Sequence, residues 1–331
     1  MNKNIVVAVD AMGGDNAPYE IVKGTVEAIS DVKNLIVKLV GQEEAINKEL
    51  QNYNYDKERI EVINATEVIS TDEVPTNAIR NKKDSSMVVG LNLVKKSEAD
   101  AFVSAGSTGA LLAGATVIVG RIKGIERPAL GTCLPGTNGF TFLLDSGANV
   151  DCKPNYLVQF AKMGSVYTEN VMGISNPRVS LANIGAEKEK GNALTKEVYE
   201  LLENTEGINF TGNIEPREIP FCLADVVVCD GFVGNTILKL SEGLAMALLG
   251  IIKEEITKGP QKIAALALKG KFKNIKTRMD SEEVGGAPFL GLKSLVVKAH
   301  GSSKSKGIKN AIKQCVAFVE NDIVSKIQQQ L

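Results

Sequence analysis

The sequence predicts an α/β protein built on a doubly wound, mostly parallel sheet, a Rossmann-like αβα sandwich, from which a pair of helices protrudes. Short aliphatic runs alternate with amphipathic segments along most of the chain, which is the pattern of repeated βαβ units. Five of these runs end in clusters of Gly, Asp, Asn, Ser or Thr. The 331 residues are 44% hydrophobic, enough to bury a large core, so we expect residues 1–331 to form a single α/β domain.

The first half of the chain alternates regularly between strands and helices. Its predicted strands cover residues 5–9, 35–40, 60–63, 101–104, 129–134 and 140–144. Its predicted helices cover residues 19–29, 43–51 and 87–96, and a fourth ends near residue 119. Pro18 falls near the first turn of the first helix, where its missing N–H costs nothing. Residues 70–86 contain Pro75 and several charges, so we expect a loop leading to the next helix.

The second half continues the alternation with one interruption. Strands are predicted at residues 179–182, 208–211, 226–228 and 294–298, and helices at residues 156–170, 194–204, 237–256, 261–279 and 306–328. Gly259-Pro260 separates the two central helices of this set, because proline cannot continue a helix. The whole pattern predicts a sheet covered by helices on both faces.

The turn after the run Val226–Val228 is the first candidate for a binding site. This β-branched run is typical of a strand buried on both faces. Asp230-Gly231 and Gly234-Asn235 predict tight turns, and Thr236 is expected to cap a helix that begins near Ile237. A strand, a glycine-bearing turn and a helix together aim free N–H groups and a helix dipole at an anion. We therefore expect phosphate or carboxylate to bind here.

Five strand ends carry similar clusters of small and polar residues. They lie at residues 10–15, 104–109, 145–149, 183–191 and 230–236. One such turn would mean little, since many glycine turns only reverse the chain. Ligands of parallel sheets bind beyond the carboxyl ends of the strands. Five such turns at equivalent positions therefore favour one shared cleft.

Three segments supply groups suited to an oxyanion. Ser104 to Ala110 begins a helix with several N–H groups and hydroxyls, although a merely capped βα turn has the same pattern. His300, the single histidine, stands at a strand end before Gly301-Ser302-Ser303, and both a structural and a catalytic role are open. Lys190 is suited to neutralising a developing oxyanion, whereas for Lys188 a solvated charge run is the preferred interpretation.

Composition and motifs exclude several classes of function. The net charge of −1 gives no field that selects nucleic acid. Neither GxGxxG nor GxxxxGK[ST] follows a strand, so a nicotinamide or P-loop nucleotide site has no support and we expect no cofactor. Asp10, Asp15, Asp145 and Asp230 could together hold Mg²⁺. We predict no metal, because Asp in a glycine-flanked turn commonly bonds its own backbone.

The chain has the features of a reduced, cytosolic protein. Its five cysteines show no CxxC pairing. The N-terminus enters the run IVVAVD directly, which is too short for a secretion signal. The longest uncharged apolar stretch, residues 244–252, is far below the roughly 20 residues that cross a bilayer.

Residues 237–280 are expected to form a helical pair with a role of its own. The first helix, ILKLSEGLAMALLGIIKEEI, is apolar around much of its circumference, which favours packing against a partner subunit. The second carries a local basic density, formed by Lys258, Lys262, Lys269, Lys271, Lys273, Lys276 and Arg278. A basic amphipathic helix suits an anionic membrane surface or an acidic protein, although an ordinary solvated helix gives the same pattern.

The motifs together resemble those of a known family. They are DAMGGD at 10–15, SAGSTGA at 104–110, RPAL at 127–130, DSGANVDC at 145–152, NIGAEKEKG at 183–191, DGFVGNTILKLSEG at 230–243, GGAPFLGL at 285–292 and KAHGSS at 298–303. In this order, and across essentially the whole chain, they are similar to those of the bacterial phosphate acyltransferases of phospholipid synthesis. One departure is Ser107, where the family usually has Asn; serine keeps a hydroxyl that can bond phosphate.

The resemblance implies a reaction, a location and an assembly. A long-chain acyl group would pass from the thioester of acyl carrier protein to inorganic phosphate, giving acyl phosphate for phosphatidic acid synthesis. Phosphate is already an anionic nucleophile, so no covalent serine or cysteine intermediate is required, and the enzyme needs chiefly to position it and stabilise the thioester oxyanion. Family members are homodimers attached to the inner face of the cytoplasmic membrane, which suits the helical pair.

The strand-end motifs and the resemblance together give the candidate site. The candidate catalytic residues are Lys190, His300, Asp230 and Asn235. The candidate substrate-binding residues are Asp10, Gly13, Gly14, Asp15, Ser104, Gly106, Ser107, Thr108, Gly109, Asn149, Asn183, Gly185, Glu187, Gly231, Gly234, Gly301 and Ser302. We expect the turns 104–110 and 230–236 to hold phosphate, with the lysine and the histidine near the reacting carbonyl or the departing thiolate.

Three other functions fit parts of the pattern. A phosphotransacylase of shorter acyl-coenzyme A thioesters would share the fold, and the basic amphipathic helices favour the carrier-protein substrate over it. A decarboxylating dehydrogenase would need Mg²⁺ and a nicotinamide fingerprint, which the sequence lacks. A non-catalytic acyl-carrier or membrane sensor would release no thiol when phosphate is added.

Overall fold

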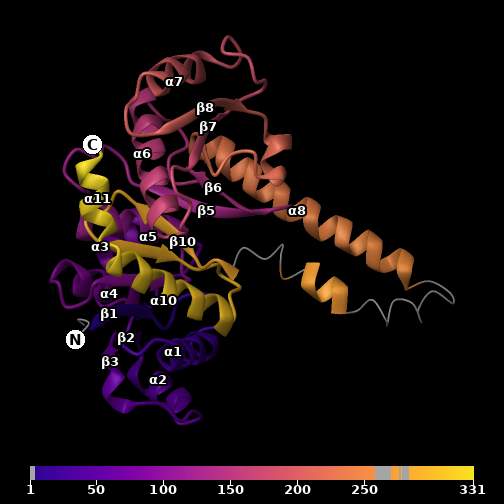
Figure 1. Cartoon of the computed structure of the whole chain (residues 1–331). Coiled ribbons are helices and arrows are strands. Elements are labelled where there is room, and N and C mark those ends of the chain that lie inside the picture. Colours follow the sequence, from indigo (N-terminus) through magenta and orange to yellow (C-terminus); the bar gives the residue numbers. More distant parts are fainter. Residues whose placement is uncertain (1–3, 258–269, 276, 278–282) are drawn as a thin grey trace.

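The computed structural model describes residues 4–257, 270–275, 277 and 283–331 of the chain (Figure 1). These residues form one large sheet with helices on its two faces, so the predicted α/β class is confirmed. A long helix, α8 (Gly231–Ile256), protrudes from this body.

The sheet contains eleven strands within the described residues, in the order β3-β2-β1-β4-β11-β10-β5-β6-β9-β7-β8. In chain order the strands are β1 (Ile5–Asp10), β2 (Leu35–Gly41), β3 (Ile60–Asn64), β4 (Ala101–Ser104), β5 (Ala129–Gly136), β6 (Gly139–Leu144), β7 (Arg178–Ala182), β8 (Asn209–Ile214), β9 (Val226–Val228), β10 (Ala287–Leu290) and β11 (Leu295–Lys298).

Helices connect most of these strands. Besides α8 they are α1 (Tyr19–Asp31), α2 (Glu43–Leu50), α3 (Pro75–Asn81), α4 (Ser86–Lys95), α5 (Thr108–Gly114), α6 (Pro154–Asn170), α7 (Ala193–Glu203), α10 (Ser305–Glu320) and α11 (Ile323–Gln329). Two 3₁₀ turns lie at Lys57–Arg59 and Pro216–Phe221, and a π-helical turn at Ala115–Val119 extends α5.

Strand direction divides the sheet into two parallel halves. β3, β2, β1, β4 and β11 run parallel to one another, and so do β6, β9, β7 and β8. Between them the pairings β11–β10, β10–β5 and β5–β6 are all antiparallel. Because three reversals invert the direction, the second half runs opposite to the first. The strand ends at residues 10–15 and 104–109 therefore leave the sheet in the opposite direction from those at residues 145–149, 183–191 and 230–236. Three of the five clusters, at 104–109, 145–149 and 230–236, nevertheless supply residues to one cleft.

Side chains of each central strand alternate between two apolar layers. Val7 and Val9 of β1 pack into one buried cluster with residues of α1, α6 and α10, whereas Ala8 packs into a second cluster with residues of α4 and α5. In β9, Val227 likewise points away from its two neighbours. The prediction of strands buried on both faces is confirmed.

Several local elements differ from the prediction. The expected loop at residues 70–86 contains α3, which starts at Pro75, a residue that needs no N–H partner in the first turn. The expected final helix is broken at Asn321-Asp322, where Asp322 has φ 47°. The segment GGAPFLGL, for which no regular element was predicted, contributes β10 to the middle of the sheet.

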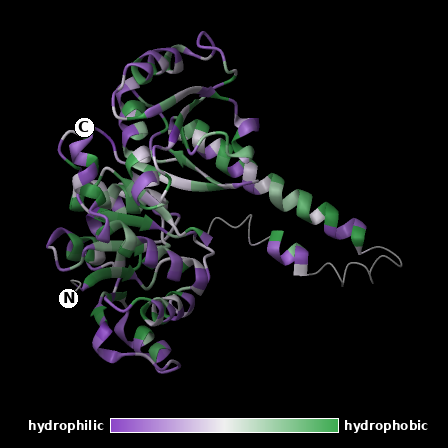
Figure 2. Cartoon of the chain, viewed as in Figure 1, coloured by the Kyte–Doolittle hydropathy of each residue, from purple (hydrophilic) through white to green (hydrophobic). Residues whose placement is uncertain are grey.

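Most apolar side chains of helix α8 are exposed to solvent. Gly231, Gly234 and Ile237 are its only buried residues, and Figure 2 shows hydrophobic colouring along much of its length. By length and composition alone it is the one helix in the described part of the chain that could cross a membrane. Most of the predicted second helix of the pair lies outside the described residues; residues 270–275 and 277 are helical.

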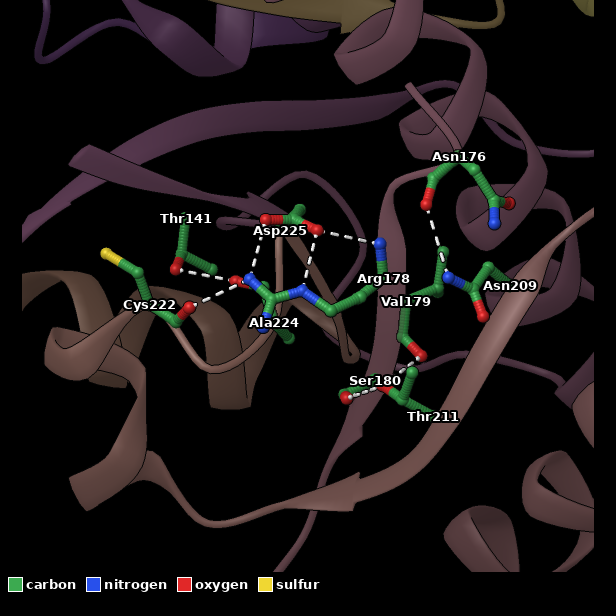
Figure 3. A network of polar contacts seen from close by, with 10 residues as sticks. All are labelled: Thr141, Asn176, Arg178, Val179, Ser180, Asn209, Thr211, Cys222, Ala224 and Asp225. Atoms are coloured by element: carbon green, nitrogen blue, oxygen red, sulfur yellow. Dashed lines mark hydrogen bonds and ion pairs between the residues drawn. The ribbon is translucent and has the colours of Figure 1, made fainter. Parts of the chain in front are cut away.

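An ion pair fixes the start of β7 against the segment that precedes β9 (Figure 3). The guanidinium of Arg178 donates from Nε and Nη2 to the two carboxylate oxygens of Asp225, at 3.0 and 2.9 Å, and the Arg178 N–H donates to the same group at 2.8 Å. A further bond runs from Arg178 to the carbonyl of Cys222. This forked pair aligns two neighbouring parallel strands at their amino ends.

Candidate active site

A cleft of about 330 Å³ lies where the two halves of the sheet meet. It is bounded by β5, the start of β10, the end of β11, the loop after β6 and the first turns of α5 and α8. Its polar lining residues are Thr108, Thr132, Ser146, Asn235, Lys239, Glu242, Lys298, His300 and Ser303. Three of the predicted site residues, Thr108, Asn235 and His300, are thus brought together from distant parts of the chain.

Lys298 is one of six polar cleft residues that the sequence reasoning missed, with Thr132, Ser146, Lys239, Glu242 and Ser303. It ends β11 and its ammonium donates to the carbonyls of Ala105, at 3.2 Å, and Ala299. Burial lowers the pKa of Lys298 to about 8, against the opposing effect of Asp10 and Asp15. A mostly desolvated cation beside the cleft is suited to holding an anion. The signal in the sequence was its place two residues before the single histidine, in KAHGSS.

His300 and Ser302 form a local pair at the mouth of the cleft. The Ser302 N–H donates to Nδ1 of His300 at 3.2 Å, and the Ser302 hydroxyl lies 2.8 Å from the same atom. Because Nδ1 accepts from the backbone, the neutral imidazole carries its proton on Nε2. The histidine is exposed, so this N–H remains available as a donor to a bound substrate.

The loop after β6 is organised by Asp145, which is fully buried. Its Oδ1 accepts from the N–H groups of Leu130, Gly147 and Ala148, and its Oδ2 accepts from the N–H and the side-chain amide of Asn149. Burial raises the pKa of Asp145, and these donors oppose that rise. The carboxylate thereby shapes the loop that presents Ser146 to the cleft, and Asn149 serves this internal bonding.

Helix α8 begins earlier than the sequence predicted. Its first residue is Gly231, and the Asp230 carboxylate caps it by accepting from the N–H of Val233 at 2.9 Å. Thr236, the expected cap, lies inside the helix and donates to the carbonyl of Phe232. The two glycines mislead because they serve close packing: a Cβ at Gly234 would lie 1.9 Å from the carbonyl oxygen of Asp145. Asp230 therefore positions α8 and its residue Asn235.

The loop after β1 packs under the end of β4 and supports the cleft from behind. Asp10 is buried and accepts from the Ser104 hydroxyl at 2.7 Å and the N–H of Met12 at 3.1 Å. Burial raises the pKa of Asp10, against these bonds. A Cβ at Gly13 would lie 2.7 Å from the nitrogen of Gly106, so the two loops touch through their backbones.

The same support continues to β11 and α5. The Asp15 N–H donates to the carbonyl of Gly301 at 2.8 Å, and a Cβ at Gly14 would meet that same oxygen at 2.9 Å. Ser107 caps α5 by accepting from Ala110, and Gly109 packs against Pro75. These predicted residues lie around the cleft without lining it, and Asp15 is exposed.

The loop after β7 lies apart from the cleft. Asn183 donates to the carbonyl of Lys190 and to the side chain of Asn213, while Glu187 accepts from Asn213 through its carbonyl. Lys190 is exposed, and a Cβ at Gly185 would contact its side chain. None of these residues lines the cleft, because β6 and β9 separate β7 from β5.

The four strand-end acids form no metal centre in the described part of the chain, where no group of three or more His, Cys, Asp or Glu side chains is arranged for a metal ion. Asp10, Asp145 and Asp230 accept N–H groups of their own turns, which is the bonding expected of Asp in glycine-flanked turns.

Comparison with known proteins gives consistent matches over nearly the whole chain. A family model described as "Fatty acid synthesis protein" matches residues 5–326. A phosphate acyltransferase of Clostridium acetobutylicum is 52% identical over 328 residues, covering 99% of each chain. A putative phosphate acyltransferase of Clostridium perfringens is 52% identical over 326 residues, covering 98% of this chain and 96% of the relative.

Solved structures match in fold. A phosphotransacetylase from Streptococcus pyogenes superimposes with a TM-score of 0.61 at 18% identity and covers 96% of this chain and 95% of its own. The EutD phosphotransacetylase from Staphylococcus aureus gives 0.59 at 17% identity, with 95% and 94% covered. At such identities the likeness concerns the arrangement of strands and helices.

Proposed function

The chain belongs to the phosphate acyltransferase family of fatty acid synthesis proteins, and on that premise we propose that it moves a long-chain acyl group from acyl carrier protein to inorganic phosphate. Family membership makes it an acyltransferase that uses phosphate. The identity of the thioester donor is the part that we propose. The single observation that supports the chemistry is the cleft that holds Lys298, His300 and four hydroxyl side chains at the junction of the sheet.

The proposed reaction needs one addition and one elimination. A phosphate oxygen attacks the thioester carbonyl, forming a C–O bond and a tetrahedral oxyanion. Collapse of that oxyanion breaks the C–S bond and releases the carrier thiolate, which takes up a proton. We assign Lys298 to holding the phosphate and the Nε2–H of His300 to the oxyanion or the departing thiolate, because both residues line the cleft.

The cysteine in the cleft is not needed as a nucleophile. Burial raises the pKa of Cys133 to about 12, so its thiol stays protonated at neutral pH. Direct attack by phosphate, which is anionic already, fits this environment better than an acyl-cysteine intermediate.

The test is a comparison of donors at one chain length. The protein is mixed with phosphate and either palmitoyl carrier protein or palmitoyl-coenzyme A, and acyl phosphate is measured. We expect the carrier-protein thioester to have the higher kcat/KM. A preference for coenzyme A would instead support an acyl-coenzyme A phosphotransacylase. No phosphate-dependent thiol release would support a non-catalytic sensor.

We further propose that the enzyme is a cytoplasmic homodimer that lies on the inner face of the membrane. The exposed apolar residues of α8 support an interface, among them Leu240, Met246 and Ile251. Residues of α8 between Asn235 and Leu248 line cavities beside β5, so only residues 249–256 project beyond them, and at about 1.5 Å per residue they reach about 12 Å. This is short of the about 30 Å hydrocarbon core, which favours surface contact over crossing.

Vesicle sedimentation tests the membrane proposal. Met246 and Ile251 are 71% and 59% exposed, so the double change to Glu keeps the fold and removes apolar contact. We expect binding to anionic vesicles to fall while acyl transfer in solution continues; retained binding would refute the role of α8. The basic residues Lys258, Lys262, Lys269, Lys276 and Arg278 lie outside the described residues.

A further inference from the structure

A second cavity of about 270 Å³ adjoins the cleft along helix α8. Its walls come from β5, from the 3₁₀ turn at Pro216–Phe221 and from one face of α8. Most of its lining is aliphatic, including Leu134, Ile219, Leu244 and Leu248. We refer to this cavity as the α8 groove.

The α8 groove and the cleft share a wall. Cys133, Leu238 and Glu242 line both cavities, so the two spaces meet at these three side chains. The cleft side carries the cation, the imidazole and the hydroxyls, whereas the groove side is aliphatic. A ligand that extends from the cleft into the α8 groove would need a polar head, which an anion such as phosphate can attack, and an apolar tail.

We propose that the α8 groove binds the first part of the acyl chain of the substrate, with the thioester carbonyl at the shared wall. This inference rests on the proposed function, since it places the tail of the same acyl thioester. A straight apolar chain fits the aliphatic lining, and burial of each methylene strengthens binding by roughly fourfold. A carbonyl at the shared wall would lie between the groove and the groups that hold phosphate.

The groove is also built for chains of more than one length. From Leu238 at the shared wall to Leu248 at the far end, α8 rises by about 15 Å. Leu244 and Leu248 are 55% and 50% exposed, so the groove opens along the helix instead of closing on its own end. A longer chain would therefore continue over the exposed apolar face of α8.

The shared wall suits a neutral, apolar occupant. The Cys133 thiol is buried and protonated, so it presents a small apolar surface there. The Glu242 carboxylate is paired with Lys239 at 3.2 Å, which offsets its charge beside the cleft. An anionic headgroup has no cation in the groove itself, because its lining contains no lysine, arginine or histidine.

Two alanines of α8 offer a matched test. Ala245 lines the groove, whereas Ala247, two residues further along the same helix, is exposed and lines neither cavity. The change Ala245→Phe places a ring in the groove, and Ala247→Phe adds the same ring outside it. Each variant and the wild type are assayed for acyl phosphate formation with acetyl-, butyryl-, octanoyl- and palmitoyl-coenzyme A, which vary only in chain length.

The expected result is a change in chain-length preference. In the wild type, kcat/KM should rise by up to roughly 15-fold for each pair of added methylenes until the groove is filled. Ala245→Phe should lower the ratio of palmitoyl to butyryl kcat/KM at least tenfold, and Ala247→Phe should keep the wild-type ratio. A fluorescent fatty acid, displaced by palmitate, gives a second readout without turnover: it should bind the wild type and Ala247→Phe but bind Ala245→Phe at least tenfold more weakly.

Three outcomes would overturn the proposal. One is an equal chain-length ratio in all three proteins. Another is fatty acid binding that Ala245→Phe leaves intact. A third is a change in oligomeric mass with Ala245→Phe and an unchanged ratio, which would make the groove a contact with a second copy. Failure of the proposed function looks different, since no acyl phosphate would form from any thioester, including those of carrier protein.

Discussion

Two loops that look alike in the sequence occupy different places in the molecule. The loop at residues 145–149 follows β6 and the loop at residues 183–191 follows β7, and both combine Gly, Asn and acidic residues after a buried strand. The first reaches the cleft because β6 adjoins β5, where the two halves of the sheet join. The second follows a strand two places further out. A strand-end motif therefore identifies a candidate, and the neighbours of the strand decide whether it joins the site.

The two loops also differ in what holds them. In the first, one buried carboxylate, Asp145, collects N–H donors from both sides of the turn. In the second, exposed side chains such as Glu187 surround a network of amides from Asn183 and Asn213. The first loop should thus tolerate far less change than the second.

Removal of the Asp145 carboxylate should lower the stability of the protein more than any of the other proposed substitutions. Asp145→Ala leaves several buried N–H groups without an acceptor, so we expect the free energy of unfolding to fall by about 3–5 kcal/mol. Glu187→Ala should change it by no more than about 0.5 kcal/mol. Urea denaturation measures both. Asp145→Asn keeps one acceptor oxygen, so its loss of stability should lie between those of Asp145→Ala and Glu187→Ala. If both Asp145 variants had wild-type stability, the proposed difference between the two loops would be wrong.

Two lysines sharpen the comparison at the level of catalysis. Lys298 lines the cleft and is half-buried, whereas Lys190 is exposed on the loop after β7. Lys298→Met should lower kcat/KM for phosphate by about 10²–10³-fold, because it removes a desolvated cation from the anion site. Lys190→Met should stay within about threefold, since water and salt screen an exposed charge.

Steady-state kinetics with phosphate as the varied substrate measures both lysine variants, and thermal unfolding confirms that each is folded. If Lys190→Met lowered kcat/KM for phosphate as much as Lys298→Met does, the loop after β7 would take part in catalysis. This result would show that the cleft of a single chain is not the whole site.

The sequence predicted local elements better than their assembly. Aliphatic runs such as Val226–Val228 are sufficient to predict a buried strand, because alternation and β-branching act locally. The reversal of direction at β10 and β5 depends on pairing between segments far apart, which no local pattern encodes. The start of α8 was missed because Gly231 and Gly234 look like turn residues, whereas their small size is needed against the loop after β6.

Only part of the candidate site was predicted, because local patterns identify residues at strand ends but do not show which strands are neighbours. His300, Asn235 and Thr108 were found because each follows a strand within a polar cluster. Lys298 was missed because it ends a strand, where a lysine is usually solvated. Its partial burial at the end of β11, beside β4, makes it a candidate only once the structure is known. Lys190 was chosen for its charge, its place after a predicted strand and the family motif around it, and none of these shows that β7 lies two strands away from β6.

The pH dependence of activity tests the burial of Lys298 directly. Its pKa is lowered to about 8, mainly by desolvation, so its charge is present below that pH and lost above it. We expect kcat/KM for phosphate to fall as the pH rises through about 8, approaching about tenfold per pH unit. Lys298→Arg stays charged and should not show this fall.

The arginine variant also serves as the control for the substrate. Ionisation of phosphate itself affects both proteins and cancels in the ratio of their kcat/KM values. A ratio that is constant from pH 7 to 9 would show that Lys298 does not titrate in this range, and that desolvation does not lower its pKa to about 8.

The smallest change in stability is expected from the Arg178–Asp225 ion pair, which anchors the start of β7 and lies outside both loops. Burial alone would raise the pKa of Asp225, but its hydrogen bonds with Arg178 lower it below the ordinary value. A carboxyl whose pKa is lowered by folding contributes stability above its unfolded pKa of about 3.9, and that contribution is lost as the pH falls through the lower, folded value. Arg178 is 45% exposed, so solvent screens the pair and Asp225→Asn should cost about 1 kcal/mol at pH 7.

The difference in stability between wild type and Asp225→Asn should therefore be constant from pH 7 to about 5 and shrink below about 4. Arg217→Gln removes a far more exposed partner, 78% accessible, from its pair with Glu215 and should change stability by less than about 0.5 kcal/mol. Urea denaturation across this pH range measures both variants. If the full difference in stability between wild type and Asp225→Asn persisted at pH 3, loss of the charge pair could not be its cause. If Asp225→Asn also lowered acyl transfer, the start of β7 would be coupled to the cleft, and the two loops would be less independent than proposed.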